Sequence, residues 1–463
     1  MNHSTNKPDK IHFVGIGGSG MSGLAEVLIN LGYSVSGSDL EESFITKRLA
    51  SLGARVYIGH KESNVTDKDM LIISSAISKE NEEILEANRN NLPILARAEL
   101  LASLMNLKKG IAIAGTHGKT TTTSILASIM TDANLDPTFI NGGIINSFAT
   151  NAKLGSGDYL IAEADESDQS FLLLQPSLAV ITNIEEDHLS NYENNFSLLK
   201  EAFVSFAKKI PFDGLIVACG DDLQVKELLP QFSRRVITYG FNEDNYYQIK
   251  NFSANGLTSS FDLCEDGNKV LDVELNILGR HNALNAVAAI IVAIDEGVPL
   301  NTIQSSLKDF SGINRRMDIK GKIKLDNKTC ILIDDYGHHP TEIRSTYQSI
   351  QESFPDSHIH MVFQPHRFTR TKDLFDDFVE VLSDVGKVLL LDIYSAGEEK
   401  IEGISSQALL DVLNKNSSNN LLIQKKDLAL TLTKEVEDNS IILMQGAGNI
   451  SELTDILLSK YKV

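Results

Sequence analysis

A glycine-rich loop at residues 115–120 carries a lysine and a threonine of the kind that bind nucleoside phosphates. The loop reads Gly115-Thr116-His117-Gly118-Lys119-Thr120, and it lies between the apolar run 111–114 and a helical segment that opens with Thr121–Thr123. In such loops the backbone N–H groups surround phosphate oxygens, the lysine reaches the β and γ phosphates, and the threonine hydroxyl binds Mg²⁺. The standard motif has a glycine where this chain has Ile113. We expect a nucleoside triphosphate site; the alternative is a glycine-rich turn with a surface lysine.

Candidate Mg²⁺ ligands follow the next two apolar runs. They are Glu163, Asp165, Glu166 and Asp168, just after the run 159–162, and Asp187 and His188, which close the segment 180–188. Carboxylates at strand tips near a phosphate loop suit Mg²⁺, which prefers oxygen ligands. We therefore expect metal ligands here; the alternative is a solvated acidic loop.

A second glycine loop lies near the N-terminus. Gly15, Gly17 and Gly20 form the pattern G-x-G-x-x-G between a strand-like run and a helix expected from about Met21, and Asp39 ends the next strand-like run. This pattern is typical of diphosphate binding, in which the helix N-terminus holds the phosphates and the acidic residue holds a ribose hydroxyl. Taken alone, the loop indicates NAD; the other alternative is a tight turn without a ligand.

Basic and polar residues follow two strand-like runs in the last third of the chain. They are Tyr336, His338 and His339 after the run 331–333, and His366, Arg367 and Arg370 after the run 359–363. We expect these runs to form neighbouring strands, so that the two tips meet. Each residue alone has an equally good interpretation as a surface or core residue.

All of these residues follow strand-like runs and precede helical ones. Strands that alternate with helices predict parallel sheets, whose ligand crevice lies beyond the carboxyl ends of the strands. Glycine-bearing openings near residues 11, 111 and 331 predict three α/β domains, over 1–107, 108–313 and 314–463. Residues 235–278 are strand-rich, and we expect them to form an antiparallel addition to the middle domain.

Composition excludes several classes of function. The chain has 463 residues, with 42 Lys and Arg against 62 Asp and Glu, and a net charge of −20. Such acidity disfavours binding to nucleic acids or anionic membranes. The 3 cysteines are far apart, which disfavours a disulfide framework. No secretory signal and no apolar run of about 18 residues are recognisable, so we expect a cytoplasmic protein.

Seven motifs together resemble the Mur ligase family, the ATP-dependent amide-bond ligases of peptidoglycan precursor synthesis. In chain order they are GTHGKTTTT, EADESD, TNIEEDH, GRHNALNA, NRRMD, DDYGHHP and QPHRFTR. Within the family, GIGGSGMSG, SSAI, EADESDQSFL, QPHRFTRT and DIYSAGE resemble the members that join L-alanine to UDP-N-acetylmuramate. The alternative is the related activity that adds a preformed tripeptide to the same nucleotide sugar. An NAD-linked oxidoreductase is the alternative from another class, and it leaves most motifs unexplained.

The resemblance implies a three-domain α/β architecture. A Rossmann-like N-terminal domain would hold the UDP-sugar, a P-loop-type central domain would hold ATP, and a Rossmann-like C-terminal domain would bring the amino acid. The diphosphate over the first glycine loop would then belong to UDP rather than NAD. The substrate carboxylate would attack the γ-phosphate of ATP, and L-alanine would attack the resulting acyl phosphate. We expect a monomer or homodimer with a locally positive site, and no carbamylated lysine.

The resemblance also implies roles for individual residues. The ATP site would comprise Gly115, Thr116, His117, Gly118, Lys119, Thr120, Thr121, Asn282, Asn285, Arg315, Arg316 and Asp334. The UDP-sugar site would comprise Gly17, Gly18, Ser19, Gly20, Met21, Ser22, Asp39, Ser75, His338 and His366. Thr120, Glu163 and His188 would bind Mg²⁺, and the catalytic residues would be Lys119, Glu163, His188, Arg367 and Arg370. Asn282 has the alternative role of capping its helix.

Overall fold

The computed structural model describes residues 8–74, 76–187, 189–415 and 419–463. Its contacts divide the chain into two compact units. The first unit comprises Met1–Lys250, Asp262–Val273 and Leu284–Phe310, and the second comprises Asn251–Phe261, Glu274–Ala283 and Ser311–Val463. The domain boundaries expected at 107/108 and 313/314 stay predictions.

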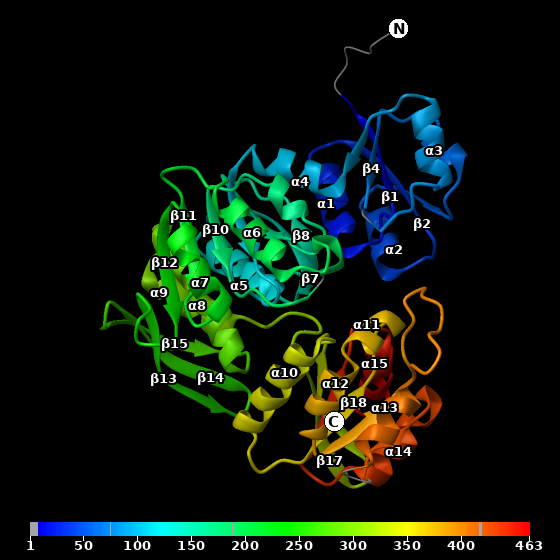
Figure 1. Ribbon diagram of the computed structural model, residues 1–463, viewed down its shortest axis with the longest axis vertical. Coiled ribbons are helices and arrows are strands. Elements are labelled where there is room, and N and C mark those ends of the chain that lie inside the picture. Colours follow the sequence, from blue (N-terminus) through cyan, green and yellow to red (C-terminus); the bar gives the residue numbers. More distant parts are fainter. Residues whose placement is uncertain (1–7, 75, 188, 416–418) are drawn as a thin grey trace. The chain divides into compact units, whose positions relative to one another are not determined.

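The N-terminal region forms a five-stranded sheet in the order β3-β2-β1-β4-β5, with every pair of neighbours parallel (Figure 1). Its strands are β1 (Lys10–Val14), β2 (Ser34–Asp39), β3 (Arg55–Ile58), β4 (Met70–Ile73) and β5 (Ile94–Ala96). Its helices are α1 (Ser19–Asn30), α2 (Phe44–Ser51), α3 (Glu82–Arg89) and α4 (Arg97–Met105). Phe13 and Val14 of the central strand are fully buried, which explains its continuous apolar sequence.

The central region forms a ten-stranded sheet in the order β15-β14-β13-β12-β11-β10-β6-β9-β7-β8. Its strands are β6 (Lys109–Ala114), β7 (Thr138–Ile145), β8 (Thr150–Lys153), β9 (Tyr159–Ala164), β10 (Leu178–Ile181), β11 (Leu215–Cys219), β12 (Arg235–Gly240), β13 (Tyr247–Asn255), β14 (Thr258–Glu265) and β15 (Asn268–Leu275). Its helices are α5 (Lys119–Asp132), α6 (Phe196–Ala207), α7 (Leu223–Leu228), α8 (Arg280–Asp295) and α9 (Leu300–Asp309).

The expected antiparallel addition over 235–278 is wrong at its first strand. β12 pairs in parallel with β11 over five residues, and β13 pairs in parallel with β12. The sequence VITYG is apolar and β-branched, as in any buried strand, so its local pattern does not distinguish the two directions.

The N-terminal and central sheets share one hydrophobic core within the first unit. Leu24 of α1 belongs to the same buried cluster as Ile140 of β7 and Ala152 of β8. A Cβ atom on Gly23 would lie 3.0 Å from the Cβ of Ala152, so α1 packs closely on the central sheet. This packing fixes the first glycine loop relative to the tips of the central strands.

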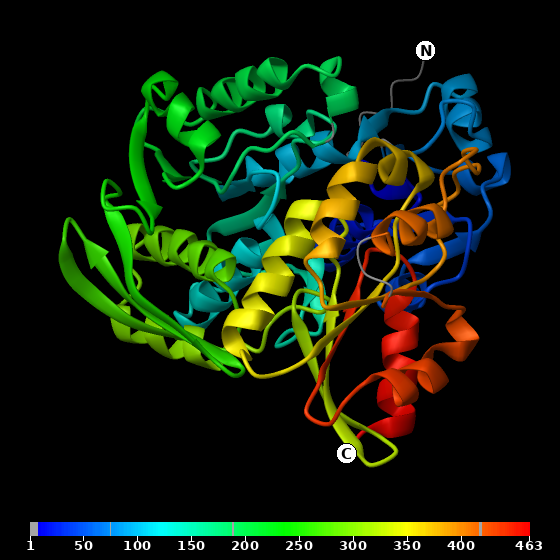
Figure 2. The same ribbon diagram turned by 60° about the horizontal axis from the view of Figure 1, so that its bottom comes forward.

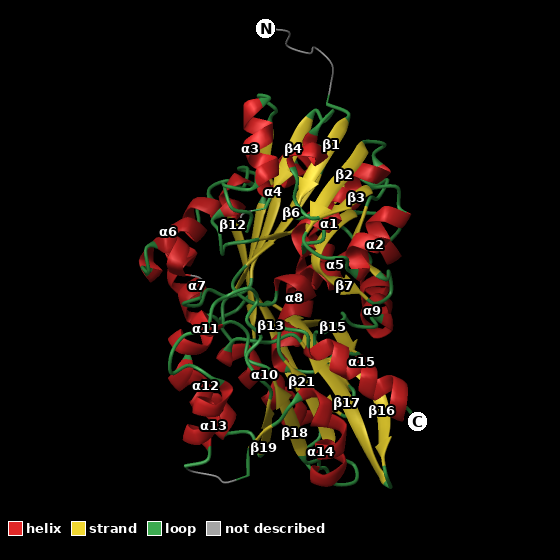
Figure 3. Cartoon of the chain, turned by 90° about the vertical axis from the view of Figure 1, so that its right-hand side faces the viewer, coloured by secondary structure: helices red, strands yellow, loops and turns green. Residues whose placement is uncertain are grey.

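The C-terminal region forms a six-stranded sheet in the order β16-β17-β21-β18-β19-β20. Its strands are β16 (Asp318–Leu325), β17 (Lys328–Asp335), β18 (Ile359–Phe363), β19 (Lys387–Leu390), β20 (Leu421–Leu422) and β21 (Ile441–Gln445). Its helices are α10 (Pro340–Ser353; yellow in Figure 2), α11 (Phe368–Asp373), α12 (Phe375–Ser383), α13 (Ser406–Leu413), α14 (Leu428–Glu435) and α15 (Ile450–Tyr461). The helices α12 and α13 cover one face of this sheet and α14 and α15 the other (Figure 3).

The expectation that the runs 331–333 and 359–363 form neighbouring strands is wrong. β21 lies between β17 and β18 and pairs in parallel with both. The last strand of the chain inserts between two earlier ones, and no local sequence pattern indicates such an insertion. The four expected strand–loop–helix openings, by contrast, are confirmed near residues 11, 111, 331 and 359.

Among the described helices, none is long and apolar enough to cross a lipid bilayer.

Candidate active site

The phosphate loop connects β6 to α5 through two glycines in the left-handed region. The φ angles are +132° at Gly115 and +87° at Gly118. A Cβ atom would lie 2.0 Å from the Thr182 hydroxyl at the first position and 2.4 Å from Asn285 Oδ1 at the second. Glycine is therefore required at both positions, and loops of this conformation can bring their backbone N–H groups close to phosphate oxygens. Thr120, in the first helical turn, is 8% exposed.

Residues after β10, which sequence reasoning missed, hold this loop in place. Asn183 accepts hydrogen bonds from the N–H of Thr116 at its carbonyl (3.1 Å) and from the N–H of His117 at its side chain (2.8 Å). The hydroxyl of Thr182 donates to the carbonyl of His117 at 2.6 Å. Because β10 pairs directly with β6 in parallel, the residues after β10 lie beside the loop that follows β6. The sequence signals were their position at a neighbouring strand end and their place in the motif TNIEEDH, to which no individual role had been given.

Lys119 forms a buried ion pair with Glu166. Its Nζ lies 2.6 Å from Glu166 Oε2, and the two side chains are 15% and 2% exposed. Burial raises the pKa of Glu166 to about 7, although Lys119 acts in the opposite direction. Burial lowers the pKa of Lys119, but Glu166 and Asp165 outweigh it, so its pKa is raised and the lysine stays charged. Glu166, which we expected among the metal ligands, is instead the partner of the phosphate-loop lysine.

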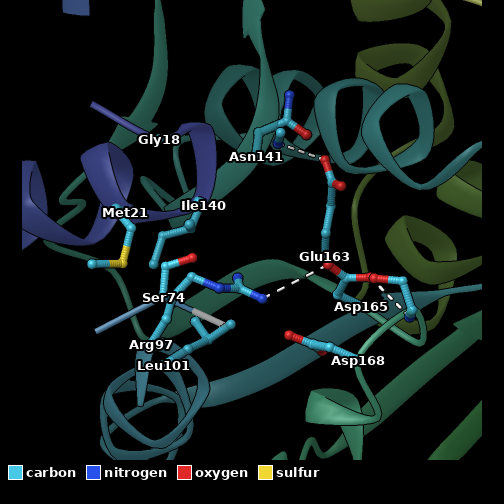
Figure 4. A pocket seen from close by; sticks show the side chains of 13 residues that line it. Gly18, Met21, Ser74, Arg97, Leu101, Ile140, Asn141, Glu163, Asp165 and Asp168 are labelled. Carbon is cyan, nitrogen blue, oxygen red and sulfur yellow. Dashed lines mark hydrogen bonds and ion pairs between the residues drawn. The ribbon is translucent and has the colours of Figure 1, made fainter. Parts of the chain in front are cut away.

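A pocket of about 280 Å³ runs between the acidic tip of β9 and the first glycine loop (Figure 4). Its lining residues are Gly18, Gly20, Met21, Ser74, Arg97, Leu101, Ile140, Asn141, Gly142, Glu163, Asp165, Ser167 and Asp168. Glu163 Oε1 accepts a hydrogen bond from the N–H of Gly142 at 2.6 Å, which orients its carboxylate. The structure therefore brings together the acidic tip of β9 and the first glycine loop.

Negative charge predominates in this pocket, and the locally positive site expected from the sequence, which involves other residues, stays a prediction. Among its lining residues, Glu163, Asp165 and Asp168 are acidic and only Arg97 is basic. Burial alone would raise the pKa of Asp165, but the charge of Lys119 and the hydrogen bonds from Ser167 outweigh burial, so the pKa of Asp165 is lowered. An all-oxygen donor set of this kind fits Mg²⁺, which would also offset the negative charge.

The first glycine loop is fixed by the end of β2. Gly15 and Ile16 donate their N–H groups to the Ser38 carbonyl at 2.8 and 2.9 Å, and Gly17 donates to Asp39 Oδ2 at 2.8 Å. At Gly18, the residue before α1, no side chain of the described residues caps the helix, and the first turn has no acidic residue. The N–H groups of this turn are thus suited to an anion.

Only some of the residues predicted at the UDP-sugar site line this pocket. Gly18, Gly20 and Met21 line the pocket, whereas Ser22 is buried in α1 at 3% exposed. Ser75, His188 and the side chain of Ser19 lie outside the described residues.

The two asparagines of α8 differ in position. Asn285 lies against the phosphate loop, as its contact with Gly118 shows. Asn282 Nδ2 donates to the carbonyl of Leu278 at 2.7 Å, and its residue is 5% exposed. Because α8 begins at Arg280, Asn282 lies inside the helix, and its alternative role as the cap is wrong.

Two histidines meet at the tips of β17 and β18. The rings of His338 and His366 are 5.8 Å apart, and Arg370 Nη1 lies 3.2 Å from His366 Nδ1. Burial is the main cause that lowers the pKa of each histidine to about 4, and nearby arginines contribute in the same direction. Both rings are therefore neutral at pH 7, so neither histidine adds positive charge to this cluster. A neutral His366 accepts the hydrogen bond from Arg370.

Arg367 begins the turn into α11 in a left-handed conformation, with φ +71°. Glu398, which sequence reasoning did not single out, supports this turn. Its carboxylate accepts hydrogen bonds from the hydroxyl (2.7 Å) and N–H (3.0 Å) of Thr369 and lies 3.8 Å from Arg367 Nη1. Tyr394 of the same loop stacks on His366 at 5.6 Å. The loop after β19 thus fixes both residues.

Arg315 and Arg316 both pack on the ring of Tyr336, with their Cζ atoms 4.9 and 5.1 Å from its centre. Arg315 Nη2 donates to the carbonyls of Gly446 and Gly448, and its Nε lies 3.9 Å from Asp334. Burial raises the pKa of Asp334 to about 6, although the charge of Arg315 acts in the opposite direction. Arg315 is thus engaged within its domain, whereas Arg316 is the more exposed of the two, at 32%.

His339 caps α10. Its Nδ1 accepts from the N–H of Thr341 at 3.4 Å, and Glu342 accepts from the N–H groups of His338 and His339. His339, which the sequence singled out only as a polar residue at this strand end, therefore has a structural role in capping the helix.

Comparisons with known proteins agree with this geometry. Three family models match in succession: the Mur ligase family catalytic domain over residues 10–109, the Mur ligase middle domain over 113–293, and the Mur ligase glutamate ligase domain over 315–448. The chain belongs to the Mur ligase family.

Several known proteins match this chain over nearly its whole length. It is 47% identical, over 98% of both chains, to the UDP-N-acetylmuramate–L-alanine ligase of Ruthia magnifica subsp. Calyptogena magnifica. The crystal structure of the UDP-N-acetylmuramate–alanine ligase MurC from Thermotoga maritima matches with a TM-score of 0.84 and 29% identity, over 97% of this chain and 98% of that one. A murein peptide ligase from Psychrobacter arcticus 273-4 has the same fold, with a TM-score of 0.71, 23% identity, and coverage of 97% and 98%.

Proposed function

We propose that this protein joins L-alanine to the carboxylate of UDP-N-acetylmuramate at the expense of ATP, in the cytoplasm. The observation that carries the proposal is the pocket between the N-terminus of α1 and the carboxylates after β9. One end suits a diphosphate and the other adjoins the phosphate loop through Lys119 and Glu166. The 47% identity to a ligase with this name supports the choice of L-alanine.

The chemistry requires the substrate carboxylate to meet the γ-phosphate. The carboxylate attacks this phosphorus to give an acyl phosphate and ADP; the amine of L-alanine then attacks the acyl carbon and expels phosphate. Both steps place negative charge on oxygen atoms, so fixed cations and N–H groups accelerate them. We assign Lys119 to the β and γ phosphates and the N–H groups of the loop to the remaining oxygens. Mg²⁺ held by Thr120 and Glu163 would offset the phosphate charge.

Residues of the C-terminal domain complete the proposal. Arg367 and Arg370 are assigned to the charged oxygens of the substrates, with His366 and Glu398 positioning them. Arg316, rather than Arg315, is assigned to the nucleotide, because the guanidinium of Arg315 is engaged by the Gly446 carbonyl.

Product analysis tests the choice of amino substrate. Purified protein is incubated with ATP, Mg²⁺, UDP-N-acetylmuramate and equal concentrations of L-alanine and the tripeptide of the related activity. The two possible products are then quantified by mass spectrometry. We expect the L-alanine adduct to dominate. A dominant tripeptide adduct would assign the protein to the recycling activity, and no adduct with either would refute ligase function.

A further inference from the structure

Arg97 is the one basic residue among those that line the pocket between the first glycine loop and the acidic tip. It is the first residue of α4, and its side chain is 19% exposed. Its Nη2 lies 3.8 Å from Asp165 Oδ2, and Figure 4 shows the guanidinium extending toward the acidic tip. Neither the motifs nor the family resemblance singled out this residue.

The guanidinium also packs against the first turn of α1. A Cβ atom on Gly20 would lie 3.0 Å from Arg97 Nη1 and 3.4 Å from Cζ. This glycine therefore leaves room for the arginine, and the positive charge lies beside an uncapped helix N-terminus. Two groups that each favour an anion thus converge on one wall of the pocket.

A second observation in the same pocket indicates a ligand with hydrogen-bond donors. Asn141, a lining residue, is 2% exposed, and its Oδ1 accepts no hydrogen bond from the described residues. Its Nδ2 is engaged, because it donates to Ser124 Oγ at 2.8 Å and to the Gly143 carbonyl at 2.9 Å. A buried oxygen without a donor is costly, and the hydroxyl or amide N–H of a sugar would satisfy it.

We infer that Arg97 binds the diphosphate of the nucleotide sugar, on the side facing the central domain, and that Asp165 holds the arginine in place until the diphosphate arrives. The inference rests on the proposed function. The planar guanidinium presents paired N–H donors that match two phosphate oxygens, and such charge-assisted bonds are strong. The contact with Gly20 places it at the helix end that receives the diphosphate, rather than at Glu163, where the sugar carboxylate would react.

Calorimetry on the full-length protein tests this role with ligands that differ by one group. The ligands are UMP, UDP, UDP-N-acetylglucosamine and UDP-N-acetylmuramate, of which UMP lacks the second phosphate and only the last has the carboxylate. We expect Arg97→Met to weaken the binding of the three diphosphates by a similar factor, roughly 10- to 100-fold, and that of UMP much less. Arg97→Lys should fall in between, because it keeps the charge but loses the paired donors.

Arg89→Met is the matched control, because Arg89 is 62% exposed on α3 and bonds only to surface glutamates among the described residues. It should leave all four affinities unchanged. The inference is overturned if Arg97→Met and Arg97→Lys, with wild-type melting temperatures and ATP affinity, bind UDP as tightly as the wild type. It is also overturned if only UDP-N-acetylmuramate is weakened, since Arg97 would then bind the carboxylate. Failure of the wild type to bind any of the diphosphates would instead refute the proposed function.

Discussion

Replacing Lys119 with methionine should destabilise the protein as well as inactivate it. Lys119 and Glu166 form a buried pair at 2.6 Å, with the carboxylate side chain only 2% exposed. Methionine keeps the length of the side chain but leaves the carboxylate without its cation. Removing one partner of a buried ion pair costs about 3–5 kcal/mol, because the other charge stays buried.

The cost should depend on pH, because Glu166 can take up a proton. Burial raises the pKa of this carboxyl to about 7 even beside Lys119, which lowers it. Without the lysine, the folded-state pKa is higher still, so the folded protein binds more protons than the unfolded chain above pH 4.5 or so. The loss of stability should therefore be smallest near pH 5 and should grow as the pH rises through 7.

Urea unfolding of single and double variants separates stability from catalysis. Lys119→Met should lower the free energy of unfolding by about 3 kcal/mol at pH 8, whereas Lys119→Met with Glu166→Gln should recover most of that loss without recovering turnover. A single variant within 0.5 kcal/mol or so of the wild type at pH 8, or a double variant no more stable than the single one, would refute the buried-pair account.

Three further predictions concern the loops and the histidines. Gly118→Ala should weaken ATP binding at least 10-fold or so, because φ is +87° and the new Cβ would contact an amide oxygen of α8. Gly297→Ala, at φ +77° with nothing within 4 Å, should cost a similar strain but leave ATP affinity intact, and equal affinities for the two variants would contradict this. Glu398→Gln should raise KM for the amino acid about 10-fold without changing KM for ATP, unlike the exposed neighbour Glu399→Gln; equal kinetics would show that the loop contacts are dispensable. His366 has a pKa lowered to about 4, so the folded protein binds fewer protons than the unfolded chain between pH 4 and 6.5, and stability should fall across that window as the pH falls. His366→Gln should reduce this pH dependence of the free energy of unfolding, measured by urea titration, by about 2 kcal/mol between pH 7 and 4.5, and an unchanged pH dependence would count against it.

The sequence was sufficient for features that depend on local order along the chain. Gly115 and Lys119 fall where the motif predicts, because a strand, a glycine turn and a helix must follow one another in that order. Asn285 is near the phosphate loop, as the family resemblance implied. The positions of Gly115 and Lys119 follow from one motif, whereas that of Asn285 follows from the family resemblance.

Features that depend on distant parts of the chain were not predictable. Glu166 lies 47 residues from Lys119, and its position among four acidic residues gave no sign that it is the buried one. Arg97 appeared to be an ordinary residue at a helix start, although it meets Asp165 across the pocket. The neutrality of His366 depends on burial and on Arg370, which no pattern of residue types reports.

The central claim is that one site couples ATP cleavage to joining the two other substrates. Phosphate release should therefore be measured with ATP and Mg²⁺ while UDP-N-acetylmuramate and L-alanine are omitted in turn. We predict sustained release only when all four components are present, and its loss in Lys119→Met with Glu166→Gln. Release that continues without the nucleotide sugar, or that does not depend on L-alanine, would contradict the account.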